Sequence, residues 1–63
     1  MSDEILTFIG EVKQISEKAV YLDVDGDLVW IPDSIADYLD DPIIRNEISF
    51  EIPEWLAIKK GLI

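Results

Sequence analysis

Three aspartates at alternate positions, Asp23, Asp25 and Asp27, have the spacing in this chain that comes closest to a metal-binding pattern. Calcium loops use such alternation because their side-chain oxygens converge on one ion. The rest of an EF-hand loop is missing, since Gly26 stands fourth rather than sixth and Ser34 occupies the twelfth position, where a glutamate is required. Asp25-Gly26 is also a complete signal for a two-residue hairpin turn, so we expect no metal site and no cofactor.

Neighbouring carboxylates, as in Asp40-Asp41 or in Glu51 with Glu54, could perform acid–base chemistry only in a cleft that shifts their pKa values. A chain of 63 residues leaves little room for such a cleft. The chain has no His and no Cys, and therefore lacks the usual general base and any thiolate metal ligand. We expect no catalytic residues and a protein that is not an enzyme.

The net charge of −9, from 14 acidic and 5 basic residues, gives the protein a field that repels nucleic-acid backbones and anionic membranes. The acidity serves either solubility or docking on a basic protein surface. For docking, the predicted contact set combines an aromatic anchor with nearby carboxylates: Asp33, Asp37, Tyr38, Asp40 and Asp41. Because no apolar run approaches about 20 residues and the N-terminus lacks a basic signal region, we expect a cytoplasmic protein with no membrane partner.

Tyr21, Trp30 and Trp55 form the alternative, an aromatic face. Aromatic side chains on a small barrel can stack with the bases of single-stranded nucleic acid, and Lys59-Lys60 could supply positive charge. Core and helix packing is the preferred interpretation of Trp30 and Trp55, because the five cations are scattered along the sequence. A third possibility is a homo-oligomer formed through an uncovered strand edge and the apolar C-terminal end.

The elements that must position these residues begin with a hairpin from Lys18 to Pro32. Apolar residues alternate on both sides of Asp25-Gly26, and this turn sets a register in which Tyr21 lies opposite Trp30. The same register places five residues on a core face: Val20, Leu22, Val24, Val29 and Ile31. Residues 1 to 4 are expected to fray, and Ile5 to Ile15 forms a strand that Ser16-Glu17 joins to the hairpin.

Gly10 falls on the apolar face of the first strand, where a glycine often marks a bulge or a sharp bend. After Pro32, Ser34 and Asp37 have the spacing of a capping box, which predicts a short helix ending near Asp40. The segment Ile43–Ile52 alternates again, with Ile44, Ile48, Phe50 and Ile52 on one face, and is predicted to be a strand. From Pro53 to Gly61 the chain carries the start and stop signals of a closing helix.

Three stretches of the chain resemble a small module that recurs in phage and prophage proteins: EKAVYLDVDGDLVWIP, WIPDS (Trp30 to Ser34) and IPEWLAIKKGLI (Ile52 to Ile63). The resemblance covers roughly residues 10 to 63 and departs from the pattern at Ser34 to Asn46. It implies a phage origin and a β-barrel, and it brings no catalytic site.

Together these patterns predict one domain, residues 1–63, that is mainly β. We expect a small SH3-like or OB-like barrel of four to five antiparallel strands, with a short helix after the third strand and a closing C-terminal helix. The expected function is a phage-type protein-interaction module whose acidic surface docks on a basic host or phage protein. Its most concrete version is an inhibitor of a host nucleic-acid-processing or defence enzyme.

Overall fold

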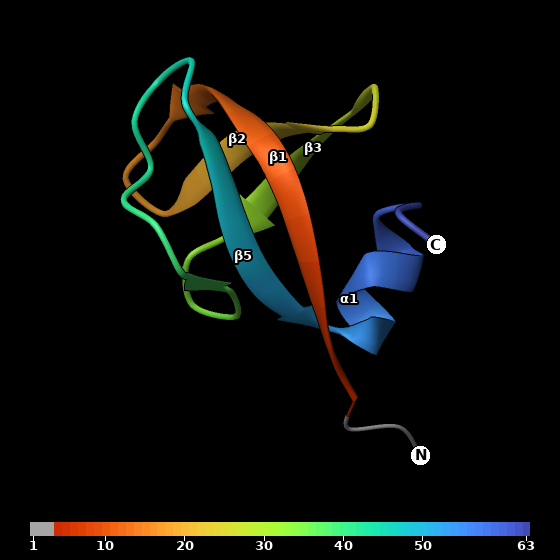
Figure 1. The fold of residues 1–63 in the computed structure, drawn as a ribbon. Coiled ribbons are helices and arrows are strands. Elements are labelled where there is room, and N and C mark those ends of the chain that lie inside the picture. Colours follow the sequence, from red (N-terminus) through yellow and green to blue (C-terminus); the bar gives the residue numbers. More distant parts are fainter. Residues whose placement is uncertain (1–3) are drawn as a thin grey trace.

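The computed structural model describes residues 4–63 as one open antiparallel sheet and a short C-terminal helix (Figure 1). The elements are β1 (Ile5–Ile15), β2 (Ala19–Val24), β3 (Asp27–Pro32), β4 (Asp37–Tyr38), β5 (Glu47–Pro53) and α1 (Glu54–Lys59), and the strand order is β3-β2-β1-β5-β4. The prediction of a mainly β chain with up to five strands is confirmed. The predicted fraying of residues 1–3 lies outside the described residues, while the Glu4 carbonyl accepts a hydrogen bond from the N–H of Glu54.

The β2–β3 hairpin has the predicted register. Tyr21 lies opposite Trp30 and Leu22 opposite Val29, and the five residues of the predicted core face are all buried. Asp25 and Gly26 both have positive φ, 52° and 90°, as the favoured two-residue hairpin turn requires. The Asp23 carboxylate accepts a hydrogen bond from the N–H of Gly26, so local chemistry accounts for the turn.

Strand β1 belongs to both halves of the sheet. Its first part, to Glu11, pairs with β5, and its second part, from Glu11, pairs with β2. The irregularity predicted for Gly10 occurs between Val12 and Gln14, where the register shifts. Gly10 itself pairs regularly with Ile48, but β2 passes so close that an added Cβ would lie 3.0 Å from Val24 Cγ2. The glycine therefore permits a close approach of two strands.

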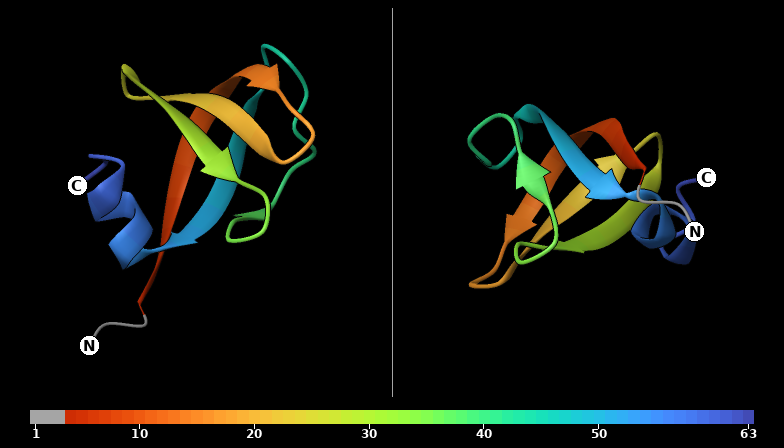
Figure 2. Two further views of the ribbon diagram at one scale, coloured as in Figure 1. Left: turned by 180° about the vertical axis from the view of Figure 1, so that it is seen from behind. Right: turned by 90° about the horizontal axis from the view of Figure 1, so that it is seen from below.

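The sheet curls so that β2 and β3 pass behind β1 and β5 in Figure 1 and in front of them in the left view of Figure 2, with α1 to one side. The inward side chains of both halves meet in a core that includes Val12, Leu22, Ile31 and Phe50, none of which is exposed. Among residues 4–63, no strand pairing joins the two edge strands β3 and β4. A side chain bridges them, because the Tyr38 hydroxyl donates to the carbonyl oxygen of Ile31.

The helix predicted after the third strand is absent, and this prediction is wrong. The Pro32 carbonyl accepts hydrogen bonds from the N–H groups of Ile35 and Ala36, which forms a tight turn, and the chain then enters β4. Tyr38 lies opposite Phe50 in the sheet, with their rings 6.5 Å apart. A single exposed helical turn has little stability of its own, so the strand pairing and the burial of Tyr38 prevail over the capping signal.

Strand β5 begins at Glu47, four residues later than predicted. Ile48, Phe50 and Ile52 are buried as expected, but Ile44 is 52% exposed. The intervening turn closes through a hydrogen bond from the Asn46 N–H to the Ile43 carbonyl, and Arg45 has a φ of 76°. This positive φ breaks the alternation, and the prediction that Ile44 faces the core is wrong.

The predicted C-terminal helix is confirmed. Pro53 precedes α1, and Gly61 ends it with a φ of 77°. Leu56 and Ala57 are buried where α1 packs against β5 and β1. Across residues 4–63, no helix has the length and apolar character needed to cross a bilayer.

Candidate functional site: the two outer sides of the sheet

Carboxylates gather on the outer side of β4, β5 and β1. Glu11 lies directly opposite Glu47 on one neighbouring strand and opposite Asp23 on the other, so three acidic residues form a row across the sheet. Asp37 lies opposite Glu51 in a second pair. We define the acidic face as these side chains together with the adjacent Asp40: Glu11, Asp23, Asp37, Asp40, Glu47 and Glu51.

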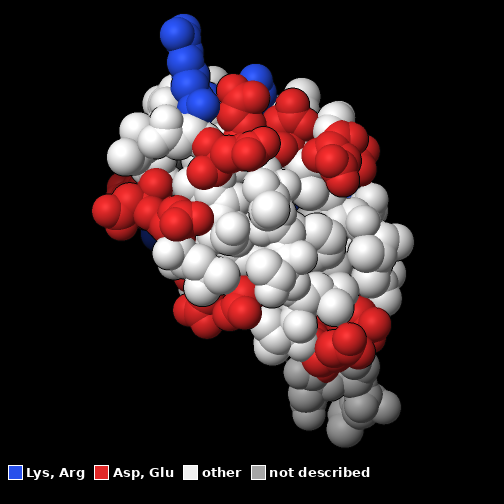
Figure 3. Space-filling view, viewed as in Figure 1, with Lys and Arg blue, Asp and Glu red and all other residues white. Residues whose placement is uncertain are grey.

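The centre of the acidic face is uncharged. Ile9 lies opposite Ser49 between the carboxylate row and the Asp37–Glu51 pair, and its side chain is 60% exposed. Figure 3 shows this arrangement as groups of acidic side chains around a white area that lies over β1 and β5. Beside Ile9, a shallow depression of about 480 Å³ is lined by seven residues: Ile9, Gly10, Glu11, Asp23, Asp25, Gly26 and Glu47. The acidic face therefore combines an exposed apolar centre with a charged rim.

Three of these carboxylates accept a hydrogen bond or form an ion pair within the protein. Glu11 accepts from the Lys13 ammonium at 3.3 Å, Asp23 from the N–H of Gly26 at 2.8 Å, and Asp40 from the N–H of Ser49 at 2.9 Å. Each carboxylate keeps acceptor capacity beyond one such bond. Among residues 4–63, no group of three or more acidic, Cys or His side chains has the arrangement of a metal site. The acidic face is thus suited to contacts with positively charged side chains.

The predicted contact set is only partly brought together by the fold. Asp37 and Asp40 belong to the acidic face, and Asp41 follows them in an exposed position. Asp33 is engaged within the protein, since its carboxylate accepts from the Tyr38 hydroxyl at 3.0 Å.

Tyr38 does not have the exposed position expected of an anchor. Its ring is half-buried against Phe50, and its hydroxyl donates to Asp33 or to the Ile31 carbonyl. Burial, with the adjacent Asp33 carboxylate, raises the pKa of Tyr38 well above its ordinary value. Both causes favour the neutral phenol, as expected of a residue that links β4 to β3. Ile9, rather than Tyr38, is the exposed apolar side chain within the acidic face.

A pair of stacked aromatic rings lies further along the curled sheet, over β2 and β3, on the same outer side of β2 as Asp23. Tyr21 and Trp30 have ring centroids 4.8 Å apart and an interplanar angle of 28°. The helix α1 packs against β5 and β1 and leaves Trp30 39% exposed. Trp55 is 51% exposed on α1, and neither Trp55 nor Trp30 belongs to the buried core, so the interpretation of the two tryptophans as core residues is wrong. We define the aromatic face as the stacked pair alone, Tyr21 and Trp30.

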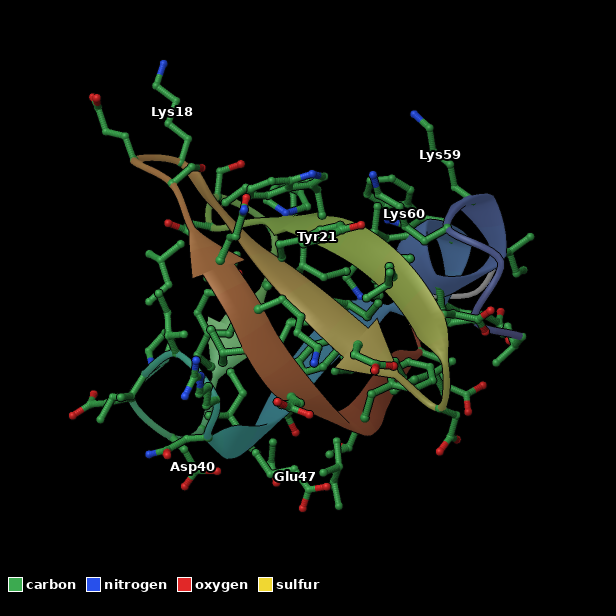
Figure 4. The ribbon with its side chains drawn as sticks, turned by 90° about the horizontal axis from the view of Figure 1, so that it is seen from above. Lys18, Tyr21, Asp40, Glu47, Lys59 and Lys60 are labelled. Carbon is green, nitrogen blue, oxygen red and sulfur yellow. The ribbon has the colours of Figure 1, made fainter. Side chains whose placement is uncertain are left out.

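Figure 4 shows that charge is distributed unequally over the molecule. Asp40 and Glu47 project from one side of the molecule, whereas Lys18, Lys59 and Lys60 lie on the side of Tyr21. The lysines come from the β1–β2 turn and from the end of α1, which are far apart in sequence. Folding therefore places these three lysines on one side of the molecule, with Lys18 at one end of that side and Lys59 and Lys60 toward the other (Figure 4).

Sequence reasoning missed four carboxylates of the acidic face: Glu11, Asp23, Glu47 and Glu51. The signal available was their position on the polar side of alternating strands. Alternation gives the side of each strand but not which strands are neighbours, so it could not show that the four converge. No protein-family model, curated protein or solved structure matches the chain.

Proposed function

We propose that this protein is a non-enzymatic interaction module whose acidic face docks on a basic surface of a partner protein. The observation that carries the proposal is the ring of six carboxylates, drawn from four strands and the segment after β4, around the exposed side chain of Ile9. An apolar centre that becomes dehydrated within a polar rim is the common anatomy of protein interfaces. The net charge of −9 adds long-range attraction toward a basic partner and speeds encounter.

The row Glu47–Glu11–Asp23 supports binding over solubility as the reason for this pattern. Solubility needs only scattered charge, whereas like charges directly opposite one another in a sheet reduce its stability. Arginine or lysine side chains of a partner would remove that repulsion on binding. In the free protein Lys13 already pairs with Glu11 and Gly26 donates to Asp23, so the cations of a partner would act chiefly on the repulsion at Glu47.

We also propose a fold type and a biological setting for the protein. The sheet, curled on a core and bridged at its edges by Tyr38, fits a small barrel of the SH3-like or OB-like kind. The resemblance to phage modules favours a phage-encoded protein that acts in the host cytoplasm. Its partner would then be a host nucleic-acid-processing or defence enzyme, because the basic grooves of such enzymes attract an acidic competitor.

Affinity capture from host lysate tests the proposal with variants matched in charge. Glu47→Lys/Glu51→Lys alters the acidic face, and Glu17→Lys/Asp27→Lys makes the same change in net charge at exposed positions outside it. We expect a stoichiometric partner at low salt that is lost with the first variant and retained with the second. Circular dichroism of both variants controls for folding.

Retention of the partner by folded Glu47→Lys/Glu51→Lys protein would refute docking through the acidic face. Equal loss with both variants would show that only total charge matters. Replacement of Ile9 by Ser, which leaves the charge unchanged, separates the apolar centre from the rim. The partner should bind this variant at least about tenfold more weakly if Ile9 is buried in the interface.

A further inference from the structure

The aromatic face is a preformed planar surface. Tyr21 and Trp30 are fixed by the β2–β3 register, and the two rings already stack in the free protein. The indole of Trp30 remains 39% exposed although its ring contacts Tyr21. A ligand that stacks on Trp30 would therefore meet a ring whose orientation is set by the sheet, at a small cost in side-chain entropy.

Three of the five cations lie on the same side of the molecule as Tyr21: Lys18, Lys59 and Lys60 (Figure 4). The two lysines of the C-terminal segment are held there by the burial of Leu56 and Ala57 and by the hydrogen bond from the Lys60 N–H to the Leu56 carbonyl. Acidic residues also lie near this face, since Asp23 follows Tyr21 by two positions in β2 and Glu17 precedes Lys18 in the β1–β2 turn.

We propose that the aromatic face is a second binding surface, for single-stranded nucleic acid. A base stacks on the exposed face of Trp30, and the flanking phosphates lie against Lys18, Lys59 and Lys60. Every base has a planar π-surface suited to such stacking, which contributes about 1–3 kcal/mol per base, whereas an acidic peptide offers carboxylates without it. Despite the net charge of −9, a polyanion can approach this face because Asp40 and Glu47 project from the side of the molecule away from Tyr21 and the three lysines (Figure 4).

This surface goes beyond the proposed docking function and does not depend on it. If both surfaces are occupied together, the module joins a basic protein to a single strand. The two surfaces should respond to different substitutions, since no residue belongs to both.

Fluorescence anisotropy with a labelled oligothymidylate of about ten nucleotides tests the proposal. We expect binding at low salt, with a slope of log K against log salt of about −2 for contacts to three phosphates. Trp30→Ala should weaken binding at least about fivefold. Lys59→Gln/Lys60→Gln should weaken it and reduce the slope, whereas Lys13→Gln/Arg45→Gln, with the same change in net charge, should not.

A measurement that leaves Trp30 in place guards against a misfolded Trp30→Ala variant. Trp55→Phe makes Trp30 the remaining tryptophan of the two, and its fluorescence should be quenched when a base stacks on it. Glu47→Gln/Glu51→Gln should bind the oligonucleotide at least as well as the unaltered protein.

Absence of binding at low salt would overturn the proposal, as would equal weakening by the two pairs of cation substitutions. Unchanged fluorescence of Trp30 at saturation would also overturn it. A polyglutamate peptide serves as a control ligand that carries negative charge but no bases. If this peptide binds as tightly as the oligonucleotide, the surface recognises negative charge alone, and the assignment to nucleic acid is wrong.

Discussion

Residues that stand directly opposite one another on the acidic face carry like charges, whereas on the aromatic face they stack. Glu11 lies opposite Glu47 and Asp23, while Tyr21 lies opposite Trp30 with their centroids 4.8 Å apart. Like charges in this position destabilise a sheet, and aromatic pairs stabilise it. The aromatic pair thus contributes to folding before any ligand binds, whereas the repulsion within the carboxylate row opposes folding and is countered by the Lys13–Glu11 ion pair and the hydrogen bond from Gly26 to Asp23.

Gly10→Ala should have the largest effect, because it disturbs β1, which carries Ile9 and Glu11 and pairs with β2, the strand of Tyr21. The new Cβ would lie 3.0 Å from Val24 Cγ2 and 3.1 Å from the Asp23 carbonyl oxygen, so β1 and β2 would have to separate. We expect a loss of about 1–3 kcal/mol in the free energy of unfolding. Urea denaturation measures it. An unchanged midpoint would mean that the two strands separate without cost and do not hold the faces in place.

Tyr38→Phe should have the next largest effect, and it acts on the acidic side. The substitution removes the hydroxyl that donates to the Ile31 carbonyl or to Asp33 and keeps the ring against Phe50. We expect a loss of about 1 kcal/mol near neutral pH, measured by urea denaturation. A loss near zero would mean that packing of the Tyr38 ring is sufficient to hold β4 in place.

The pH dependence of the same variant gives a second readout. The pKa of Tyr38 is raised in the folded protein. The stabilisation of the folded state by the Tyr38 hydroxyl is therefore complete below the ordinary tyrosine pKa of about 10. It declines as the pH rises above that value, since the unfolded chain then releases the proton more readily. The stability difference between the unaltered protein and Tyr38→Phe should therefore narrow in alkaline solution. A constant difference up to about pH 11 would contradict this linkage.

A double-mutant cycle at Tyr21 and Trp30 measures the stacking directly. Replacing each residue by Ala, singly and together, should give a coupling energy of about 0.5–1 kcal/mol from unfolding curves. The single substitutions should each destabilise the protein. A coupling energy near zero would remove the contrast in stability between the two faces.

Glu47→Gln should have the smallest effect and the opposite sign. It relieves the repulsion with Glu11 and leaves the exposed side chain almost the same size. We expect a gain of a few tenths of a kcal/mol at low salt, which shrinks as salt screens the charges. Thermal melts at two ionic strengths measure this gain, with Glu17→Gln as the matched control. A loss of stability with Glu47→Gln would show that the row is favourable in the free protein.

Sequence alone determined the features that depend on neighbours along the chain. Asp25-Gly26 specified the turn and thereby the pairing of Tyr21 with Trp30, while Pro53 and Gly61 bounded α1. Alternation also identified the buried side of β5 from Ile48 onward. These signals sufficed because positive φ, proline and period-two burial act within a few residues.

Only the tertiary structure decided the segment between β3 and β5 and the composition of both faces. The capping signal at Ser34 did not produce a helix, because Tyr38 pairs with Phe50, twelve positions after Tyr38 in the chain. Glu11, Glu47 and Asp23 form a row because β1 pairs with β5 and β2 together, and Lys18 shares a side with Lys60 because the sheet curls. Pairing between distant strands is fixed by burial of the common core, a property of the whole chain that no local pattern contains.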